Sequence, residues 1–292
     1  MRVEKIGNAA LCLGKMEETI GNIQQADHIL TDPPYLYIKT HDFDKAWDEQ
    51  LFFENAKRLL PDDGFIALFG RGTSFYRWNT RLAELGFVFK EEIVWEKGYI
   101  TSPCMAILRV HETISIHTKK TGKIRSQKVP YTEQRRYDIE GVVNDIKRIK
   151  SAINTEAGLD NILVFLREEK LYSNKKNNGF GITLKSALDR PREISSMQSI
   201  SKGMKEKSVV KLNSKHYKLS HPTEKPVRLA ERVLALISDP GDTIYDPFMG
   251  SGSFGAACIR TGRKYIGSEI KPEYFDIARK RIEEAVKHYE QA

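Results

Sequence analysis

The sequence predicts an α/β protein with a mostly parallel, twisted sheet, helices on both faces, and an inserted segment. Alternating strand and helix patterns occupy the two ends of the chain, over residues 1–118 and 220–292. Each end is too short for a good doubly wound sheet, but together they would form one. Residues 119–219 lack this pattern, and polar runs such as SNKKNNG separate a few short apolar pieces. We therefore expect residues 1–118 and 220–292 to form two halves of one α/β domain around an insert over residues 119–219.

The first half contains a buried strand that ends at an acidic residue. Two prolines follow Asp32 and no helix could continue through them, so residues 27–31 are expected to form a strand. Asp32 would then lie at the strand end, where open α/β sheets bind their ligands. The pattern next predicts, in order, a helix over 45–60, a strand over 64–70, a helix over 74–85, a strand over 87–97 and a strand from His111.

The second half contains a turn rich in glycine between a strand and a helix. The pattern predicts a strand over 243–246, the turn PFMGSGS, a helix through Thr261 and a strand over 264–270. A helix over 227–237 precedes this unit, and another begins near Glu273. This alternation is typical of a parallel sheet with crossover helices.

The net positive charge comes from the middle of the chain. Residues 117–218 hold 23 Lys and Arg against 11 Asp and Glu, a net charge of +12, whereas the remainder carries −4. Such a segment would attract the phosphates of a nucleic acid. The pattern alone equally fits a solvated basic surface. Lys119, Lys120, Lys123 and Arg125 are the candidate phosphate contacts.

Composition argues against several classes of protein. No stretch approaches the roughly 20 apolar residues of a membrane span, and no export signal follows the first charged residues, so we expect a cytoplasmic protein. Cys12, Cys104 and Cys258 are far apart and lack the paired spacing of a zinc site. We expect neither a disulfide nor a metal site, and we interpret His111 and His117 as structural.

The segment from Asp246 to Ser253 has the features of a cofactor turn. It follows a strand and opens a helix, and Gly250 and Gly252 would let a nucleotide-like group approach the backbone. Glu269, 17 residues after Gly252, ends the next strand and could accept hydrogen bonds from ribose hydroxyls. A lone Gly-x-Gly is more often a structural turn, but the strand, turn, helix, strand and acid together favour a cofactor.

The sequence DPPY at residues 32–35 would suit chemistry on a planar amino group. The prolines hold the backbone open, so the Asp32 carboxylate and the Pro33 carbonyl could both accept hydrogen bonds from one amino group. The ring of Tyr35 offers a face for a base. Because such a nitrogen is a poor nucleophile, catalysis would depend on positioning and electrostatics and would need no covalent enzyme intermediate.

The motif order resembles the permuted amino-methyltransferases of DNA, the group often called β. The resemblance rests on TDPPY, WEKG, an HE-containing strand, a basic middle, HPTEKP, and DPFMGSGS with a downstream acid, and covers about residues 26–118 and 219–285. It implies a Rossmann-like methyltransferase fold, S-adenosylmethionine as cofactor and residues 119–219 as the region that recognises double-stranded DNA. It is compatible with a homodimer and with a cognate restriction endonuclease.

The resemblance also implies roles for individual residues. Asp32, Pro33, Pro34 and Tyr35 would bind and activate a flipped base. The residues implied to bind the cofactor are Asp246, Pro247, Phe248, Gly250, Ser251, Gly252, Glu269, His221, Thr223 and Lys225. The family usually has an acidic residue after a glycine, about twenty residues before DPPY, that contacts the cofactor's adenine. This chain has AALCLGKME there, with no aspartate. Asn8 or a backbone group would have to substitute.

The target base is expected to be adenine, methylated at its N6 amino group. In the family, Asp as the first residue of the tetrapeptide accompanies mostly adenine, and Ser mostly cytosine, so Asp32 favours adenine. Methylation of cytosine N4, of RNA or of a protein amide remains an alternative, although the basic middle favours nucleic acid. A non-catalytic DNA-binding module is a further alternative, and the intact DPPY and glycine turns argue against it.

Overall fold

The computed structural model describes residues 2–35, 46–100, 106–154, 192–213 and 224–291. They form two compact units, one of Met1–Arg125 with Lys207–Ala292 and one of Ser126–Glu206. The second unit is shorter at both ends than the insert expected over 119–219. The flanking segments join the first unit through backbone contacts: the Arg125 amide donates to the Leu236 carbonyl, and the Leu212 amide to that of Glu96.

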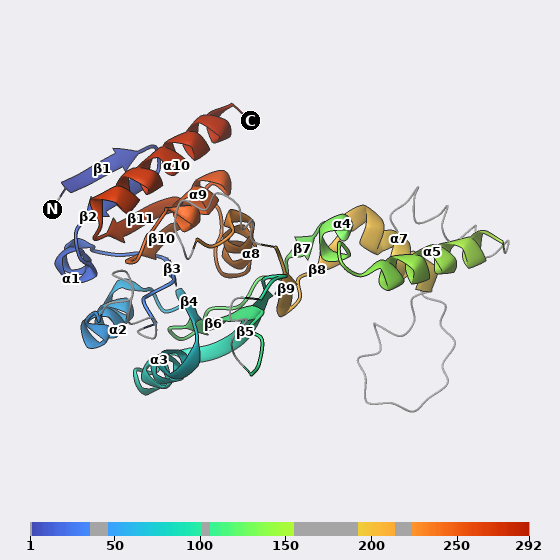
Figure 1. The fold of residues 1–292 in the computed structure, drawn as a ribbon, viewed down its shortest axis with the longest axis horizontal. Coiled ribbons are helices and arrows are strands. Elements are labelled where there is room, and N and C mark those ends of the chain that lie inside the picture. Colours follow the sequence, from blue (N-terminus) through green and yellow to red (C-terminus); the bar gives the residue numbers. More distant parts are fainter. Residues whose placement is uncertain (1, 36–45, 101–105, 155–191, 214–223, 292) are drawn as a thin grey trace. The chain divides into compact units, whose positions relative to one another are not determined.

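The first unit is built on a nine-stranded sheet whose middle strands are parallel (Figure 1). Strands β2, β11, β10, β3 and β4 run parallel, β6 is antiparallel to β4 and to β5, and β1 is antiparallel to β2. This mixed α/β sheet confirms the predicted fold class. In spatial order the strands are β1 (Arg2–Ile6), β2 (Ala9–Leu13), β11 (Lys264–Glu269), β10 (Thr243–Asp246), β3 (His28–Thr31), β4 (Phe65–Gly70), β6 (His111–Thr118), β5 (Val88–Glu96) and β9 (Val209–Lys211).

Helices cover both faces of this sheet, as the alternation of buried side chains requires. Leu30 and Phe65 belong to a core shared with helices α8–α10, whereas their neighbours Ile29 and Ile66 belong to a core shared with α1–α3. The helices are α1 (Met16–Thr19), with the 3-10 turn η1 (Ile20–Asn22) after it, α2 (Glu49–Leu59), α3 (Gly72–Glu84), α8 (Val227–Ile237), α9 (Ser253–Arg260) and α10 (Pro272–Glu290). Over the described residues, none is long and apolar enough to cross a membrane.

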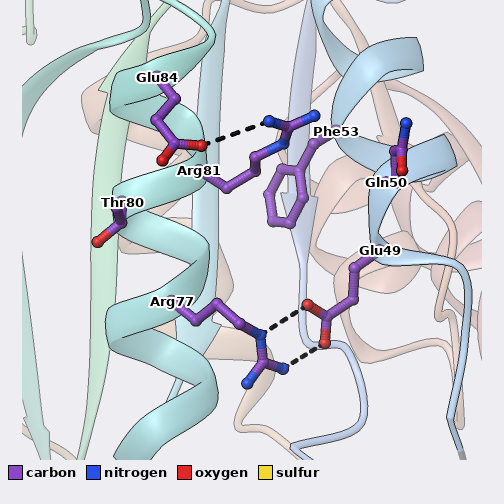
Figure 2. A pocket seen from close by; sticks show the side chains of 7 residues that line it. All are labelled: Glu49, Gln50, Phe53, Arg77, Thr80, Arg81 and Glu84. Atoms are coloured by element: carbon purple, nitrogen blue, oxygen red, sulfur yellow. Dashed lines mark hydrogen bonds and ion pairs between the residues drawn. The ribbon is translucent and has the colours of Figure 1, made fainter.

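Helices α2 and α3 border a shallow pocket on their outer surface (Figure 2). The Arg77 guanidinium makes two hydrogen bonds to the Glu49 carboxylate, at 3.0 and 2.5 Å, and Arg81 contacts Glu84 at 3.3 Å. The two arginines of the pocket are therefore paired with carboxylates that also line it. None of the site residues expected from the sequence lines it.

The pairing of β3 with β10 joins the two halves of the sequence. Ile244 lies opposite His28, and Tyr245 lies opposite Ile29, in parallel register. Strands β4 and β11 extend the sheet on either side of this pair. The two stretches that are each too short for a doubly wound sheet thus complete one sheet, as the sequence predicts.

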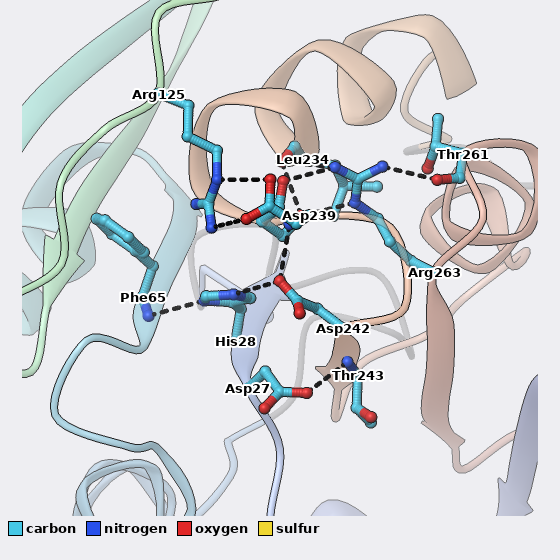
Figure 3. A network of polar contacts seen from close by, with 11 residues as sticks. Asp27, His28, Phe65, Arg125, Leu234, Asp239, Asp242, Thr243, Thr261 and Arg263 are labelled. Atoms are coloured by element: carbon cyan, nitrogen blue, oxygen red, sulfur yellow. Dashed lines mark hydrogen bonds and ion pairs between the residues drawn. The ribbon is translucent and has the colours of Figure 1, made fainter.

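A polar network ties the halves together at the edge where β3 and β10 begin (Figure 3). The His28 Nδ1 accepts from the Phe65 amide at 3.1 Å, so the proton is on Nε2, which donates to Asp242 at 3.1 Å. Burial lowers the pKa of His28 and outweighs the opposite effect of Asp242. Arg125 makes two hydrogen bonds to Asp239 nearby. Segments far apart in the sequence therefore share one network of hydrogen bonds.

The second unit contains three described helices and a short antiparallel pair of strands. Asp145, only 3% exposed, accepts hydrogen bonds from Tyr131 at 3.0 Å and Ser196 at 2.9 Å and forms an ion pair with Arg135 at 3.2 Å. One buried carboxylate thus joins all three helices. The elements are β7 (Lys128–Val129), α4 (Tyr131–Gln134), α5 (Ile139–Ile153), α7 (Arg192–Lys202) and β8 (Met204–Lys205).

We predict that His117 makes the fold sensitive to acid. Its side chain is buried, and burial lowers its pKa to about 4. Below pH ~6.5, His117 binds a proton in the unfolded chain but not in the folded chain. The free energy of unfolding therefore falls as the pH drops from ~6.5 towards 4. Replacing His117 by Phe should reduce this loss in urea unfolding at pH 7 and pH 5. The exposed His288→Phe serves as control, and equal pH dependence in all three proteins would contradict the prediction.

Candidate active site

Three strand ends that carry acidic residues meet at one edge of the sheet. Asp32 follows β3, Asp246 ends β10 and Glu269 ends β11, and these strands are parallel neighbours. Because parallel strands point the same way, all three residues lie at the carboxyl edge, where open α/β sheets bind ligands. The structure therefore brings the DPPY turn and the glycine turn together, although more than two hundred residues separate them.

The DPPY turn is held by groups that the sequence did not indicate. The Trp47 indole Nε1 donates to the Pro34 carbonyl at 3.1 Å, and the Ser74 hydroxyl donates to the Tyr35 carbonyl at 2.7 Å. The Tyr35 hydroxyl donates to the Asp32 Oδ1 at 2.5 Å. The prolines fix the backbone dihedrals, and these contacts fix the orientation of the whole turn. Trp47 lies just before α2, and no local pattern in the sequence indicates that its indole would meet the DPPY turn.

Lys225 lies against the Asp32 carboxylate. Its ammonium donates to the Asp32 Oδ2 and also lies 3.3 Å from the Glu112 Oε2. Burial and the charge of Glu112 raise the pKa of Asp32, and this outweighs the lowering by Lys225 and Tyr35. Burial lowers the pKa of Lys225, but Asp32 and Glu112 raise it by more, so the lysine stays charged.

The sequence predicts that Lys225 binds the cofactor, whereas in the structure its ammonium contacts the Asp32 carboxylate. His221 and Thr223, expected beside it, lie outside the described residues. The ammonium lies 5.5 Å from the ring centre of Phe69 and 6.0 Å from that of Tyr35. Such contacts favour a cation in a buried site.

Asp246 is fully buried and joins three strands. Its Oδ1 accepts hydrogen bonds from the Thr31 hydroxyl at 2.8 Å and the Phe248 amide at 3.1 Å, and its Oδ2 accepts from the Tyr265 hydroxyl at 3.0 Å. Burial raises its pKa to about 7, and these donors limit the rise. The geometry suits a residue that shapes the turn more than one that touches a cofactor.

The two glycines of the turn have different surroundings. Gly250 has φ +54°, and a Cβ built there would meet nothing within 4 Å. Gly252 has φ +77°, but its Cβ would lie 2.8 Å from the Cα and Cβ of Ala278 on α10. Only Gly250 therefore has open space beside it, and Gly252 is required for close packing of α9 against α10.

Glu269 holds the glycine turn and keeps capacity for a further hydrogen bond. Its Oε2 accepts from the Gly250 amide and its Oε1 from the Lys271 amide, both at 2.9 Å. Burial raises its pKa to about 7, against the effect of these amides. The Ile270 amide also interacts with this carboxylate, and because a carboxylate has about four acceptor positions, one position stays open to a ribose hydroxyl. Ser251, also expected at the cofactor, accepts from Arg281 at 2.8 Å.

An aromatic cluster connects the two turns. The ring centre of Phe248 lies 5.0 Å from that of Trp47, which lies 5.6 Å from Trp78, and Trp78 lies 6.1 Å from Tyr35. These distances are typical of favourable edge and tilted contacts between rings. Phe248, which follows Pro247 in the glycine turn, thus packs against the same rings that support the DPPY turn. Both turns share one rigid apolar support.

The contact expected between Asn8 and the cofactor's adenine does not fit the topology. Asn8 precedes β2, which runs parallel to β11 with Ala9 opposite Tyr265 and Leu13 opposite Glu269. Asn8 therefore lies at the amino edge of the sheet, away from Glu269. The other end of β2 lies beside Glu269, where the Gly14 amide donates to the Glu269 carbonyl at 2.9 Å.

The basic residues expected to contact DNA lie at the edge opposite to Asp32. Thr118, which precedes them, pairs with Phe65 at the beginning of β4. Lys119 donates to the Leu60 carbonyl at 2.7 Å, Lys120 to Asp62 at 3.0 Å, and Arg125 pairs with Asp239. Lys123 is exposed. The structure does not bring this cluster to the edge that carries Asp32, so it gives the expected phosphate contacts no support.

Comparisons with known proteins identify relatives of this arrangement. A model of the DNA methylase family (N6_N4_Mtase) matches residues 26–280. The type II methyltransferase M2.DpnII of Streptococcus pneumoniae is 25% identical over 270 residues, which are 92% of this chain and 77% of that protein. The DNA adenine methyltransferase YhdJ of Escherichia coli (strain K12) is 46% identical over 70 residues, 24% of each chain.

A solved structure supports the same assignment at the level of the fold. The crystal structure of the M1.HpyAVI-SAM complex has a TM-score of 0.55 and 22% identity, over 94% of this chain and 99% of that one. The family match covers both halves of the sheet and the segment between them. It confirms the resemblance seen in the order of the motifs. The chain therefore belongs to the DNA methylase family and is an S-adenosylmethionine-dependent DNA methyltransferase.

Proposed function

We propose that this enzyme methylates the N6 amino group of adenine in double-stranded DNA. The observation that carries the proposal is the position of the DPPY turn and the open glycine turn at adjacent strand ends. The aspartate that opens the tetrapeptide and the similarity to YhdJ, named a DNA adenine methyltransferase, both favour adenine. A homodimer and a partner restriction endonuclease stay predictions from the family resemblance.

On the base side, Asp32 and Pro33 would accept the hydrogens of the adenine amino group. Two acceptors on one amino group weaken the conjugation of the nitrogen lone pair with the ring and aim it at the methyl carbon. The Tyr35 ring would stack on the flipped base. The bound cofactor would supply the methyl group as an electrophile whose leaving group keeps the bonding electron pair. Asp32 would accept the proton that the amino nitrogen loses.

On the cofactor side, the open space at Gly250 and the remaining acceptor position of Glu269 fit S-adenosylmethionine. That cofactor supplies a methyl group on a positively charged sulfur. The Gly250 backbone would allow close approach, Glu269 would accept from a ribose hydroxyl, and Phe248 would contact the methionine side. Asp246 and Gly252 would act indirectly, by shaping the turn.

The first prediction from the proposed function concerns the methylated product and the role of Asp32. Nucleoside analysis of DNA treated with the enzyme and S-adenosylmethionine should yield N6-methyldeoxyadenosine and no N4-methyldeoxycytidine. Asp32→Asn should lower kcat by about 100-fold or more, because a neutral amide is a weaker acceptor and can turn its donors toward the substrate. Cofactor affinity in calorimetry should change little.

The control for this prediction is Asp63→Asn, an exposed aspartate in the turn before β4. It changes the same charge without touching either strand end, so its activity should match the wild type. Methylcytosine as the sole product would overturn the proposed target. An Asp32→Asn enzyme with more than half the wild-type kcat would overturn the proposed role of the carboxylate.

The second prediction separates the two glycines. Gly250→Ala should fold, with a strain of roughly 1–2 kcal/mol for a left-handed residue, and should weaken cofactor binding by about tenfold or more. Gly252→Ala should instead lower the melting temperature more strongly, because α10 would have to move away from α9. Thermal unfolding and cofactor calorimetry on both variants provide the test. Equal effects of the two variants on binding and stability would contradict the assignment.

The third prediction uses the pKa of about 7 that burial gives Glu269. Ribose hydroxyls donate best to the ionised carboxylate, so cofactor affinity should rise with pH up to about 7 and level off above it. Below the pKa, affinity should fall by up to about tenfold per pH unit. Glu269→Gln should bind more weakly and lose most of this pH dependence. A wild-type affinity that is constant between pH 5.5 and 8 would contradict the expected ribose contact.

A further inference from the structure

Four charged side chains form a chain of ion pairs at the carboxyl edge of the sheet. Lys97 follows β5, Glu112 lies near the start of the antiparallel β6, Asp32 follows β3, and Lys225 precedes α8. The Glu112 Oε1 pairs with Lys97, its Oε2 with Lys225 at 3.3 Å, and Lys225 pairs with the Asp32 Oδ2. We call these residues the ion quartet.

The ion quartet is buried and neutral overall. The exposed fraction is 8% for the Lys97 side chain, 6% for Lys225, 11% for Glu112 and 16% for Asp32. Removing ions from water costs several kcal/mol each, and a buried ionic group often stabilises a fold no better than apolar side chains of the same volume. The fold alone therefore does not require four charges here, and one of them belongs to the proposed catalytic residue.

Both oxygens of Asp32 have partners before any substrate arrives. Tyr35 donates to Oδ1, and Lys225 donates to Oδ2. An ammonium on a carboxylate oxygen makes that oxygen a weaker acceptor for the adenine amino group. Lys225 must therefore yield part of this contact, and a buried ammonium can do so only if another carboxylate takes it. Glu112 is already within reach on its other side.

We propose that Glu112 and Lys97 are positioning residues that control the strength of the ion pair between Lys225 and Asp32. Glu112 would receive the ammonium of Lys225 as the adenine amino group reaches Asp32, and Lys97 would fix Glu112 in place for this exchange. The movement of Lys225 from one carboxylate to the other does not change the net charge of the group. This inference rests on the proposed function, because it concerns the availability of Asp32 to the amino group.

The two positioning residues act in opposite directions on Asp32. Glu112→Gln leaves Asp32 as the carboxylate for Lys225, which tightens that contact. Lys97→Met leaves Lys225 as the cation for Glu112, which draws Lys225 away from Asp32. The charged and titratable groups that face Asp32 are Tyr35 on its own turn, Lys225, Glu112, and Asp246 on β10. Removal of Glu112's charge lowers the pKa of Asp32, and removal of Lys97's charge raises it.

The experiment compares kcat, KM and the pH profile of kcat/KM for wild type, Glu112→Gln, Lys97→Met and Glu112→Asp. We expect Glu112→Gln to lower kcat by about 10- to 100-fold, with cofactor affinity within about threefold of wild type. The acidic limb of kcat/KM for DNA, measured at saturating S-adenosylmethionine so that Glu269 does not set it, should move to lower pH in Glu112→Gln and to higher pH in Lys97→Met. Glu112→Asp keeps the charge and should recover part of the rate.

The control is Glu92→Gln, an exposed glutamate on β5 that lies opposite Ser115 of β6. It should leave kcat and the pH profile unchanged. Lower thermal stability with unchanged kcat and unmoved acidic limbs would make the quartet merely structural and would overturn the inference. Limbs that move in the same direction in both variants would also overturn it. If the wild type itself does not methylate adenine, the proposed function has failed, which is a distinct result.

Discussion

The hydrogen bonds to the Asp246 carboxylate are the constraint on which both turns depend. One oxygen binds the hydroxyl of Thr31, the last residue before the DPPY turn, and the amide of Phe248 in the glycine turn. The other oxygen binds Tyr265 on the strand that ends at Glu269. A single buried group thus sets the relative positions of the base side and the cofactor side, and the aromatic cluster behind them keeps the spacing rigid.

Local signals in the sequence sufficed for the elements that carry the chemistry. Strands 27–31 and 243–246 were predicted because each is a short apolar run ended by a turn that no helix can continue, and β3 and β10 match them within a residue. Helix α8 has the predicted bounds. Helix α2 begins at Glu49, later than predicted, because the Asp48 side chain accepts from the Leu51 amide and caps it there.

Features that depend on distant partners could not be predicted. The ion quartet joins Lys225 to Asp32 across 193 residues, and no spacing in the sequence indicates which carboxylate a lysine will meet. A charge count located the basic segment but not the edge of the sheet on which it lies, so Lys119 and Arg125 fell opposite to Asp32. The sequence analysis did not predict β1 or β2. Strand β1 is largely exposed and lacks an alternating apolar pattern, and β2 takes its place in the sheet from β11, which is distant in the sequence.

The parallel pairing of β3 with β10 also determines when the protein can fold during its synthesis. Strands β3 and β4 are synthesised before the whole second unit, and β10, the partner of β3, is synthesised after it. Until then one edge of β3, with its apolar residues Ile29 and Leu30, lacks the β10 partner. Contacts this far apart in the chain form slowly. The nascent chain therefore has an open strand edge that can pair with other chains.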